Sequence, residues 1–454
     1  MNLVPIKRIS AVLVAALIMT WPALYNGFPL LYPDTMNYLQ DGGNVVRALF
    51  LPDFSEYGAR SLIYCIGILP WHWNITPWPI VGLHAVLTAY VLWLVVRSVL
   101  PRRTLTAYFA LVVPLCLLTG LGWFVGYIMP DILGPVLYLS IFLIAFSWDA
   151  LARPERLAVG LIACWAMASH PTHLILGGGL CILVGLLLLF KRQSEDGWLG
   201  LVGRLAAIIL AAALAQLTLH TCLYGEPSLF GKQPPFLLAR VIADGPGRWY
   251  LQQYCPDQKL AVCDYVHVLP DNSDEFLWAH GGIYESASPA KQERLRQEEM
   301  GVVLGTIRAY PWAVLSISAT HFWRQLNTFG LWNYAPNPWI LEKVDMVLPG
   351  ARSHYLKSRQ AQETLHERFF TSVQAWTFWA SLVVISVWAL LLGRGWSRRL
   401  VGLAAVIIFV VIANAAVAGV LSNISDRYQS RVVWLVPLLA GVMVLEWLDR
   451  RHRS

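Results

Sequence analysis

The chain has 454 residues, of which 57% are hydrophobic and only 13% are charged. A soluble globular protein has about 25% charged residues, and a disordered chain combines low hydrophobicity with high charge, so this composition excludes both classes. The mean hydropathy of +0.54 and the repeated apolar runs indicate an all-α polytopic membrane protein. The net charge of +7 comes largely from short loops between these runs, which indicates membrane topology and no nucleic-acid partner.

About ten transmembrane helices are predicted from the apolar runs. The first run, about residues 9–31, follows Lys7 and Arg8 without a small-residue cleavage site, so we expect a retained signal anchor. The other predicted spans lie at about residues 76–99, 105–121, 132–146, 157–168, 172–190, 199–219, 376–392, 400–421 and 432–447. Several of these runs are shorter than the ~20 residues that cross the hydrocarbon.

The orientation follows from basic residues in alternate loops. These residues are Lys7, Arg8, Arg102, Arg103, Arg153, Arg156, Lys191, Arg192, Arg398, Arg399, Arg450, Arg451 and Arg453. The opposing loops at 120–130 and 169–171 contain no Lys or Arg. The positive-inside rule therefore predicts a multi-pass protein of the cytoplasmic (inner) membrane with both termini in the cytoplasm and its largest loop external, or periplasmic.

Residues 312–331 are apolar but contain His321 and Arg324. Counting this segment as a full span would place Arg398 and Arg399 outside, so we interpret it as an interfacial or re-entrant helix.

Three domains are predicted along the chain. Residues 1–220 form a seven-helix membrane module whose first external loop covers 32–75, and residues 374–454 form a three-helix membrane segment. Between them, residues 221–373 form a mostly helical external subdomain inserted after the seventh helix. Within it, two prolines precede a predicted helix over 236–243, and Ser288-Pro289 opens another.

Two acidic residues stand at predicted external ends of membrane helices. Asp34 follows the first span on a proline-fixed turn, and Asp131 is the only acidic residue in the long apolar stretch from 105 to 147. Both suit helix capping. An ionisable group at this depth also indicates function, and a carboxylate at the membrane surface can accept a proton from a substrate hydroxyl. We therefore take Asp34 and Asp131 as the candidate catalytic residues.

Arg427 and Arg431 lie four residues apart in the last predicted external turn, on the side where positive charge is disfavoured. They would either snorkel to lipid phosphates or bind a phosphate group of a substrate at the outer surface. The wider set of candidate substrate-binding residues comprises Tyr38, Arg60, His170, His173, Arg324 and Tyr428.

His170 and His173 have no Cys or carboxylate close in sequence, so we interpret them as polar turn residues and predict no metal site. Cys255 and Cys263 lie in a region predicted to be external, where a disulfide is permitted, and a structural bridge between them is favoured.

This layout resembles the GT-C superfamily of polytopic glycosyltransferases, which take sugars from polyprenyl-phosphate carriers. The resemblance is carried by an early Asp in a large first external loop, a second external acid before the fourth helix, and the Arg427-Tyr428 turn before an apolar span. The insertion after the seventh helix is similar to the aminoarabinose and protein-mannosyl branches. The resemblance implies roles as base or metal ligand for Asp34, as second acid for Asp131 and as late cation for Arg427.

Members of that superfamily often carry paired acids in the first loop, whereas Thr35 follows Asp34 here, so a divalent metal is not favoured and no cofactor is expected. The expected partners are a polyprenyl-phosphate-linked sugar donor, membrane lipid, and a glycan, lipid or protein acceptor. Three alternatives remain open: a polysaccharide polymerase that uses lipid-linked repeats, a flippase or transporter of lipid-linked sugars, and a non-catalytic assembly subunit. The absence of an internal repeat disfavours transport.

Overall fold

The computed structural model describes residues 3–51, 58, 61–191, 198–331, 334–392 and 396–451. Across these ranges the chain is helical and contains no β-strand, and one isolated parallel bridge pairs Leu30 with Tyr127. The predicted all-α class is confirmed. The chain divides into unit 1 (Met1–Leu229, Phe329–Val411 and Gln429–Ser454) and unit 2 (Phe230–Thr328 and Ile412–Tyr428).

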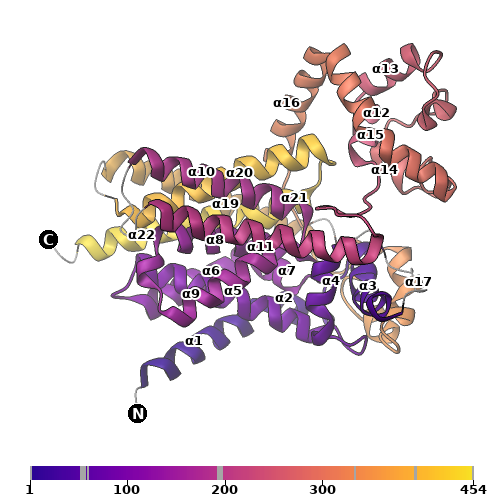
Figure 1. The fold of residues 1–454 in the computed structure, drawn as a ribbon. Coiled ribbons are helices and arrows are strands. Elements are labelled where there is room, and N and C mark those ends of the chain that lie inside the picture. Colours follow the sequence, from indigo (N-terminus) through magenta and orange to yellow (C-terminus); the bar gives the residue numbers. More distant parts are fainter. Residues whose placement is uncertain are drawn as a thin grey trace. The chain divides into compact units, whose positions relative to one another are not determined.

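The long helices of unit 1 run roughly parallel to one another (Figure 1). Its α-helices before the insertion are α1 (Leu3–Met19), α2 (Trp21–Asn26), α3 (Pro33–Phe50), α4 (Leu62–Ile68), α5 (Trp78–Val99), α6 (Thr104–Leu118), α7 (Leu121–Gly126), α8 (Leu133–Phe146), α9 (Arg153–Ala168), α10 (Pro171–Lys191) and α11 (Trp198–Tyr224). Three short 3₁₀ turns join them: η1 (Leu69–Trp71), η2 (Pro130–Ile132) and η3 (Trp148–Ala150). Unit 1 also contains α17 (Pro338–Val347), α18 (Arg352–Leu356), α19 (Glu367–Leu392) and α22 (Leu435–Arg451).

Unit 2 is built from shorter helices around its own apolar core, in which Leu238, Leu251 and Phe276 are buried. Its helices are α12 (Phe236–Ala243), α13 (Pro246–Tyr254), η4 (Ala261–Tyr265), α14 (Ser273–Leu277), α15 (Pro289–Ala309) and α16 (Pro311–Asn327). The predicted helix over 236–243 and the predicted helix start after Ser288 are confirmed. The boundary between the units falls within α20 (Arg398–Leu421) and α21 (Asp426–Val433).

Six helical segments among the described residues are long and apolar enough to cross a membrane. They are Lys7–Asn26, Trp78–Val99, Leu199–Tyr224, Glu367–Leu390, Arg398–Leu421 and Asp426–Arg451. A seventh arises if α15 and α16, which meet at 105°, count as one broken span or re-entrant loop. The structure is therefore consistent with a multi-pass membrane protein, and the number of ten spans remains a prediction.

The difference from ten lies in apolar helices that are too short to cross alone. Among them, α6 has 15 residues and ends before Thr119, and α8 has 14 residues and ends before Ser147. At ~1.5 Å per residue, each rises about 21 to 23 Å, which is less than the ~30 Å of hydrocarbon. The helix in the apolar run over 105–121 thus ends at Leu118, because the backbone of Thr119 is extended.

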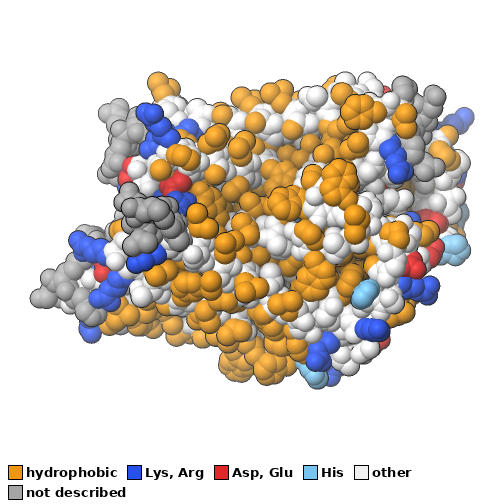
Figure 2. Space-filling view, turned by 90° about the horizontal axis from the view of Figure 1, so that it is seen from below, with side chains coloured by type: hydrophobic (Ala, Val, Ile, Leu, Met, Phe, Trp, Pro, Cys, Tyr) orange, Lys and Arg blue, Asp and Glu red, His pale blue; other side chains and the backbone are white. Residues whose placement is uncertain are grey.

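One face of the molecule carries a broad band of hydrophobic side chains, and Lys and Arg side chains gather toward its two ends (Figure 2). Exposed leucines of α1 and α9 include Leu17, at 66%, and Leu161, at 62%. A soluble monomer rarely exposes an apolar patch larger than a few hundred Å². The exposed leucines therefore suit contact with lipid.

An ion cluster joins α1, α5 and α9 at the end of unit 1 that is predicted to be cytoplasmic. Arg97 donates to both carboxylate oxygens of Glu155, at 2.5 and 2.8 Å, Arg8 also binds this carboxylate, and the Ala152 N–H donates to it at 2.9 Å. Burial opposes ionisation of Glu155, but the hydrogen bonds from Arg97 and Ala152 and the charges of Arg97 and Arg8 lower its pKa to about 2. The cluster thus holds three helices together through one ionised carboxylate.

Candidate functional site

The two segments that contain the candidate acids are hydrogen-bonded to each other in unit 1. The Leu30 N–H donates to the Gly126 carbonyl at 2.9 Å, and the Ile128 N–H donates to the Leu30 carbonyl at 3.1 Å. These bonds form the isolated parallel bridge between Leu30 and Tyr127. The stretch just before Asp34 is therefore held beside the stretch just before Asp131, although nearly a hundred residues separate the two acids in sequence.

Asp34 stands in the first turn of α3, whose start is specified locally. Gly27 ends α2 with a positive φ of 81°, a conformation that glycine adopts without strain, and Pro33 occupies the first helical position of α3. The Thr35 hydroxyl accepts from the Tyr32 N–H at 2.9 Å and donates to the Ile128 carbonyl at 3.1 Å. The partly buried Asp34 is thus fixed at a helix N-terminus, which favours a negative charge.

Gln360 holds the same loop from a distant part of the chain. Its wholly buried side chain accepts from the Leu31 N–H at 3.0 Å and donates to the Leu31 carbonyl at 2.7 Å. The backbone N–H of Gln360 donates to the Asn26 side chain at 2.7 Å. Gln360 was not among the sequence candidates, because a single glutamine in a polar stretch carries no signal until its partner 329 residues away is known.

Asp131 and Arg431 form an ion pair inside unit 1. A guanidinium nitrogen of Arg431 lies 3.5 Å from a carboxylate oxygen of Asp131, and the two side chains are 4% and 5% exposed. Removing one partner of such a buried pair leaves an uncompensated charge and costs about 3 to 5 kcal/mol. The structure therefore brings together one candidate acid and one candidate phosphate-binding residue.

The residues next to Arg431 anchor its helix to unit 1. The Ser430 hydroxyl donates to the Gly330 carbonyl at 2.8 Å and accepts from the Gln374 side chain at 3.2 Å, and the Gln429 side chain donates to the Val411 carbonyl at 3.0 Å. All three α21 side chains from Gln429 to Arg431 are buried. Arg431 is therefore held on a fixed backbone.

Further buried polar groups surround this ion pair. His173 Nδ1 lies 3.0 Å from the Ala166 carbonyl, which can only accept, so Nδ1 carries a proton and Nε2 of the neutral ring is an acceptor. Neither His173 Nε2 nor the Tyr138 hydroxyl has a hydrogen-bond partner among the described residues. Gly134, three residues after Asp131, permits the approach of His173, since a Cβ there would lie 3.1 Å from Nε2. The predicted residue His173 thus belongs to this buried cluster.

Tyr38 lies in an aromatic cluster. Its ring packs edge-on against that of Tyr64 at 5.1 Å, and the Tyr64 hydroxyl lies 3.2 Å from His84 Nε2. Electrostatic interactions link Asp131 with both Tyr64 and His84. Tyr64 and His84 were not among the sequence candidates, because an isolated Tyr or His in an apolar run also suits an ordinary core position.

The remaining sequence candidates lie in unit 2, in a local turn or outside the described residues. Arg427, Tyr428 and Arg324 belong to unit 2, where the Arg427 guanidinium lies 5.0 Å from the centre of the Tyr428 ring and Arg324 is exposed. His170 accepts from the Thr172 N–H at 3.2 Å in the turn before α10. Arg60 lies outside the described residues. A shared phosphate site of Arg427 and Arg431 remains a prediction.

Unit 2 has a polar cluster of its own around the buried side chain of Arg240. This guanidinium lies 3.3 Å from Asp244 and donates to the Gly419 carbonyl at 3.1 Å, and it also contacts His321. Burial raises the pKa of Asp244 to about 6 against the opposing effect of Arg240. This cluster connects α12, α16 and the last turn of α20 within unit 2.

Cys255 and Cys263 form a disulfide in unit 2, with their Cα atoms 5.4 Å apart. Within the described ranges, no group of three or more His, Cys, Asp or Glu side chains is arranged to hold a metal ion. The chain matches no protein-family model, no curated protein and no solved structure. The function is therefore inferred from the site itself.

Proposed function

We propose that the chain is a membrane glycosyltransferase of GT-C type, which moves a sugar from a polyprenyl-phosphate carrier to an acceptor hydroxyl. The reaction takes place at the outer face of the cytoplasmic membrane, with both termini inside. The observation that supports this proposal most is the β-bridge between Leu30 and Tyr127. It joins the segment before Asp34 to the segment before Asp131, and Asp131 is paired with Arg431. A general base and a cation for an anionic donor thereby belong to one unit.

In the proposed reaction the acceptor oxygen attacks the anomeric carbon of the sugar. The bond between that carbon and the phosphate oxygen breaks, and the polyprenyl phosphate leaves with the electron pair. Asp34 takes the proton of the acceptor hydroxyl. Because the leaving group is already an anion that needs little protonation, one carboxylate suffices, unlike glycoside hydrolysis with its usual pair.

Arg431 and Asp131 bind and orient the donor in this proposal. The Arg431 guanidinium supplies positive charge for the donor phosphate, and its ion pair with Asp131 lies within unit 1. Asp131 in turn fixes the position of Arg431 and compensates its charge before the donor arrives. The His173 acceptor nitrogen and the Tyr138 hydroxyl are available for sugar hydroxyls in the same buried region.

We propose the membrane arrangement expected from the sequence, with ten crossings and an external subdomain. In this arrangement the shorter apolar helices, such as α6 and α8, cross together with the turns and short helices that follow or precede them. Where a helix ends before it reaches the membrane surface, the backbone that follows exposes polar groups. These groups are tolerated at that depth only if the protein itself surrounds them. Such a region gives the donor phosphate a polar site while its lipid tail stays in the bilayer.

The decisive experiment is Asp34→Asn, assayed as sugar transfer to surface glycans by mass spectrometry in a deletion strain complemented with each variant. Asparagine keeps the size of the side chain but cannot accept the proton, so transfer should fall at least about 100-fold at unchanged protein abundance. Asp149→Asn, which alters an exposed acid paired with Arg399, is the matched control. Full activity of the Asp34 variant would show that Asp34 is not the general base. The N-cap residue of α3 is Tyr32, so the expected capping position of Asp34 is not found either.

A further inference from the structure

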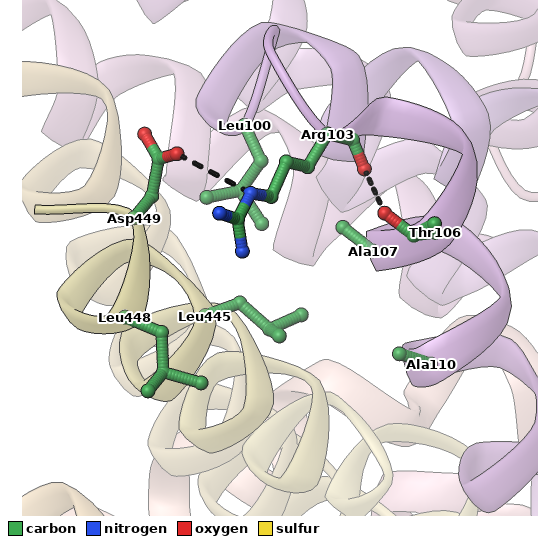
Figure 3. A pocket seen from close by; sticks show the side chains of 8 residues that line it. All are labelled: Leu100, Arg103, Thr106, Ala107, Ala110, Leu445, Leu448 and Asp449. Atoms are coloured by element: carbon green, nitrogen blue, oxygen red, sulfur yellow. Dashed lines mark hydrogen bonds and ion pairs between the residues drawn. The ribbon is translucent and has the colours of Figure 1, made fainter. Parts of the chain in front are cut away.

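A second site lies at the opposite end of unit 1, between the start of α6 and the last turns of α22. It is a pocket of about 200 Å³ (Figure 3). Deeper along the same helix pair, a Cβ on Gly441 would lie 2.4 Å from Leu111, so the two helices touch closely there. Toward their ends, small Ala107 and Ala110 face Leu445 and Leu448 across the pocket, which leaves the space unfilled.

The pocket is apolar along its walls and charged at one edge. Figure 3 shows the Arg103 side chain reaching from the start of α6 toward Asp449 on α22. Arg103 Nε lies 3.9 Å from the Asp449 carboxylate, and the two side chains are 52% and 17% exposed. An exposed pair at this distance contributes little stability, so Arg103 can turn its remaining N–H groups to another anion at small cost.

The surroundings point to a ligand from the lipid bilayer. Arg102 precedes Arg103, and Arg450 and Arg451 follow Asp449, so positive charge predominates here. Trp447 lies on the same last turns of α22, with the Arg451 guanidinium 4.1 Å from its ring centre, as suits a residue at headgroup depth. An apolar slot beside arginines at that depth matches a molecule with an acyl chain and a phosphate.

We propose that this pocket binds an anionic phospholipid of the adjacent leaflet, with its phosphate on Arg103 and the upper part of one acyl chain along Ala107, Ala110 and Leu445. A cavity of about 200 Å³ suits a segment of one acyl chain and not a whole lipid. The neighbouring arginines repel the ammonium group of a zwitterionic lipid and select a net negative headgroup. The site is independent of the proposed sugar transfer.

Two variants test the two halves of the site. Arg103→Gln removes the charge, whereas Ala110→Leu fills the pocket without a change in charge; Ala110 is exposed, so a leucine there leaves the packing intact. The control is Arg153→Gln, which removes an exposed arginine at the same end but outside the pocket. The thermal unfolding of the purified full chain in detergent is followed while dioleoyl phosphatidylglycerol, dioleoyl phosphatidylcholine or inorganic phosphate is titrated in.

We expect phosphatidylglycerol to stabilise the wild type and the control at matching concentrations, and each pocket variant to need about tenfold more of it. Phosphatidylcholine and inorganic phosphate should have little effect. Equal responses of Ala110→Leu and wild type would overturn the proposal, since the acyl chain would then lie elsewhere. Stabilisation by inorganic phosphate as strong as that by the lipid would also overturn it. If Arg103→Gln does not fold, the Ala110→Leu arm still decides.

Discussion

Unit 1 has an acid–arginine cluster toward each end, and the two differ in how deeply the arginine side chains are buried. Glu155 receives two hydrogen bonds from Arg97, a third from the Ala152 N–H and a further contact from Arg8. Arg8 and Arg97 are 28% and 27% exposed, whereas Arg431 and Asp131 are 4% and 5% exposed. Beside the buried pair, His173 Nε2 and the Tyr138 hydroxyl have no hydrogen-bond partner among the described residues. The Glu155 cluster suits a structural joint, by which we mean a cluster that only holds helices together.

The Asp131–Arg431 pair suits a binding site. Buried polar atoms are nearly always hydrogen-bonded in folded proteins, so acceptors and hydroxyls that the protein itself does not use indicate an external partner. An ion pair therefore becomes a candidate site through the unpartnered polar groups beside it as well as through its burial. Three experiments test these two assignments.

The largest effect is expected from removing either charge of the buried pair. Asp131→Asn and Arg431→Gln should each lower sugar transfer at least about 100-fold and also destabilise the protein, because each leaves a buried charge without its partner. The double variant Asp131→Arg/Arg431→Asp restores the pair and should recover abundance but not activity. Transfer by mass spectrometry and abundance by immunoblotting are measured in parallel. Recovery of both would reduce the pair to a structural role.

A smaller effect, on stability alone, is expected at the other cluster. Glu155→Gln should lower the free energy of unfolding by about 3 kcal/mol near pH 7, since Arg8 and Arg97 lose their shared partner. Because folding lowers the pKa of Glu155 from 4.5 to about 2, its contribution is complete above pH 4.5 and is lost as the pH falls toward 2. The difference between variant and wild type should therefore shrink in acid.

Thermal unfolding in detergent across this pH range measures that difference. The control Asp149→Asn, at an exposed ion pair, should cost less than about 1 kcal/mol. A cost for Glu155→Gln as small as that of the control would contradict the interpretation of this cluster as a joint.

The smallest effect is expected where the two acid-bearing segments are tied. Thr35→Val keeps the shape but removes the hydrogen bonds to Tyr32 and Ile128, at a cost of about 1 to 2 kcal/mol. Asp34 then loses its fixed position, so transfer should fall about tenfold with the protein still folded. Thr306→Val, at a buried threonine bonded within its own helix, should leave transfer unchanged. Undiminished transfer by the Thr35 variant would show that these two hydrogen bonds are not needed for catalysis.

Composition and apolar periodicity were sufficient to predict an all-helical membrane protein, because the cost of exposing so much apolar surface to water leaves few alternatives. Local signals also predicted the helix over 236–243 and the helix start after Ser288, since proline and glycine act through the backbone of their own neighbours. The lengths of the apolar helices were less predictable. The run over 105–121 is mostly apolar and contains no charged residue, yet its helix ends at Leu118.

In the candidate site, too, some features could be predicted from the sequence and others could not. Residue type and position in the chain singled out Asp34, Asp131, Arg431 and His173, because charged or titratable groups are rare in apolar surroundings. The pairing of Asp131 with Arg431, 300 residues apart, and the support of Leu31 by Gln360 exist only in the folded chain. Local backbone preferences act over a few residues, whereas an ion pair or a buried amide acts on whatever the packing of helices brings within reach.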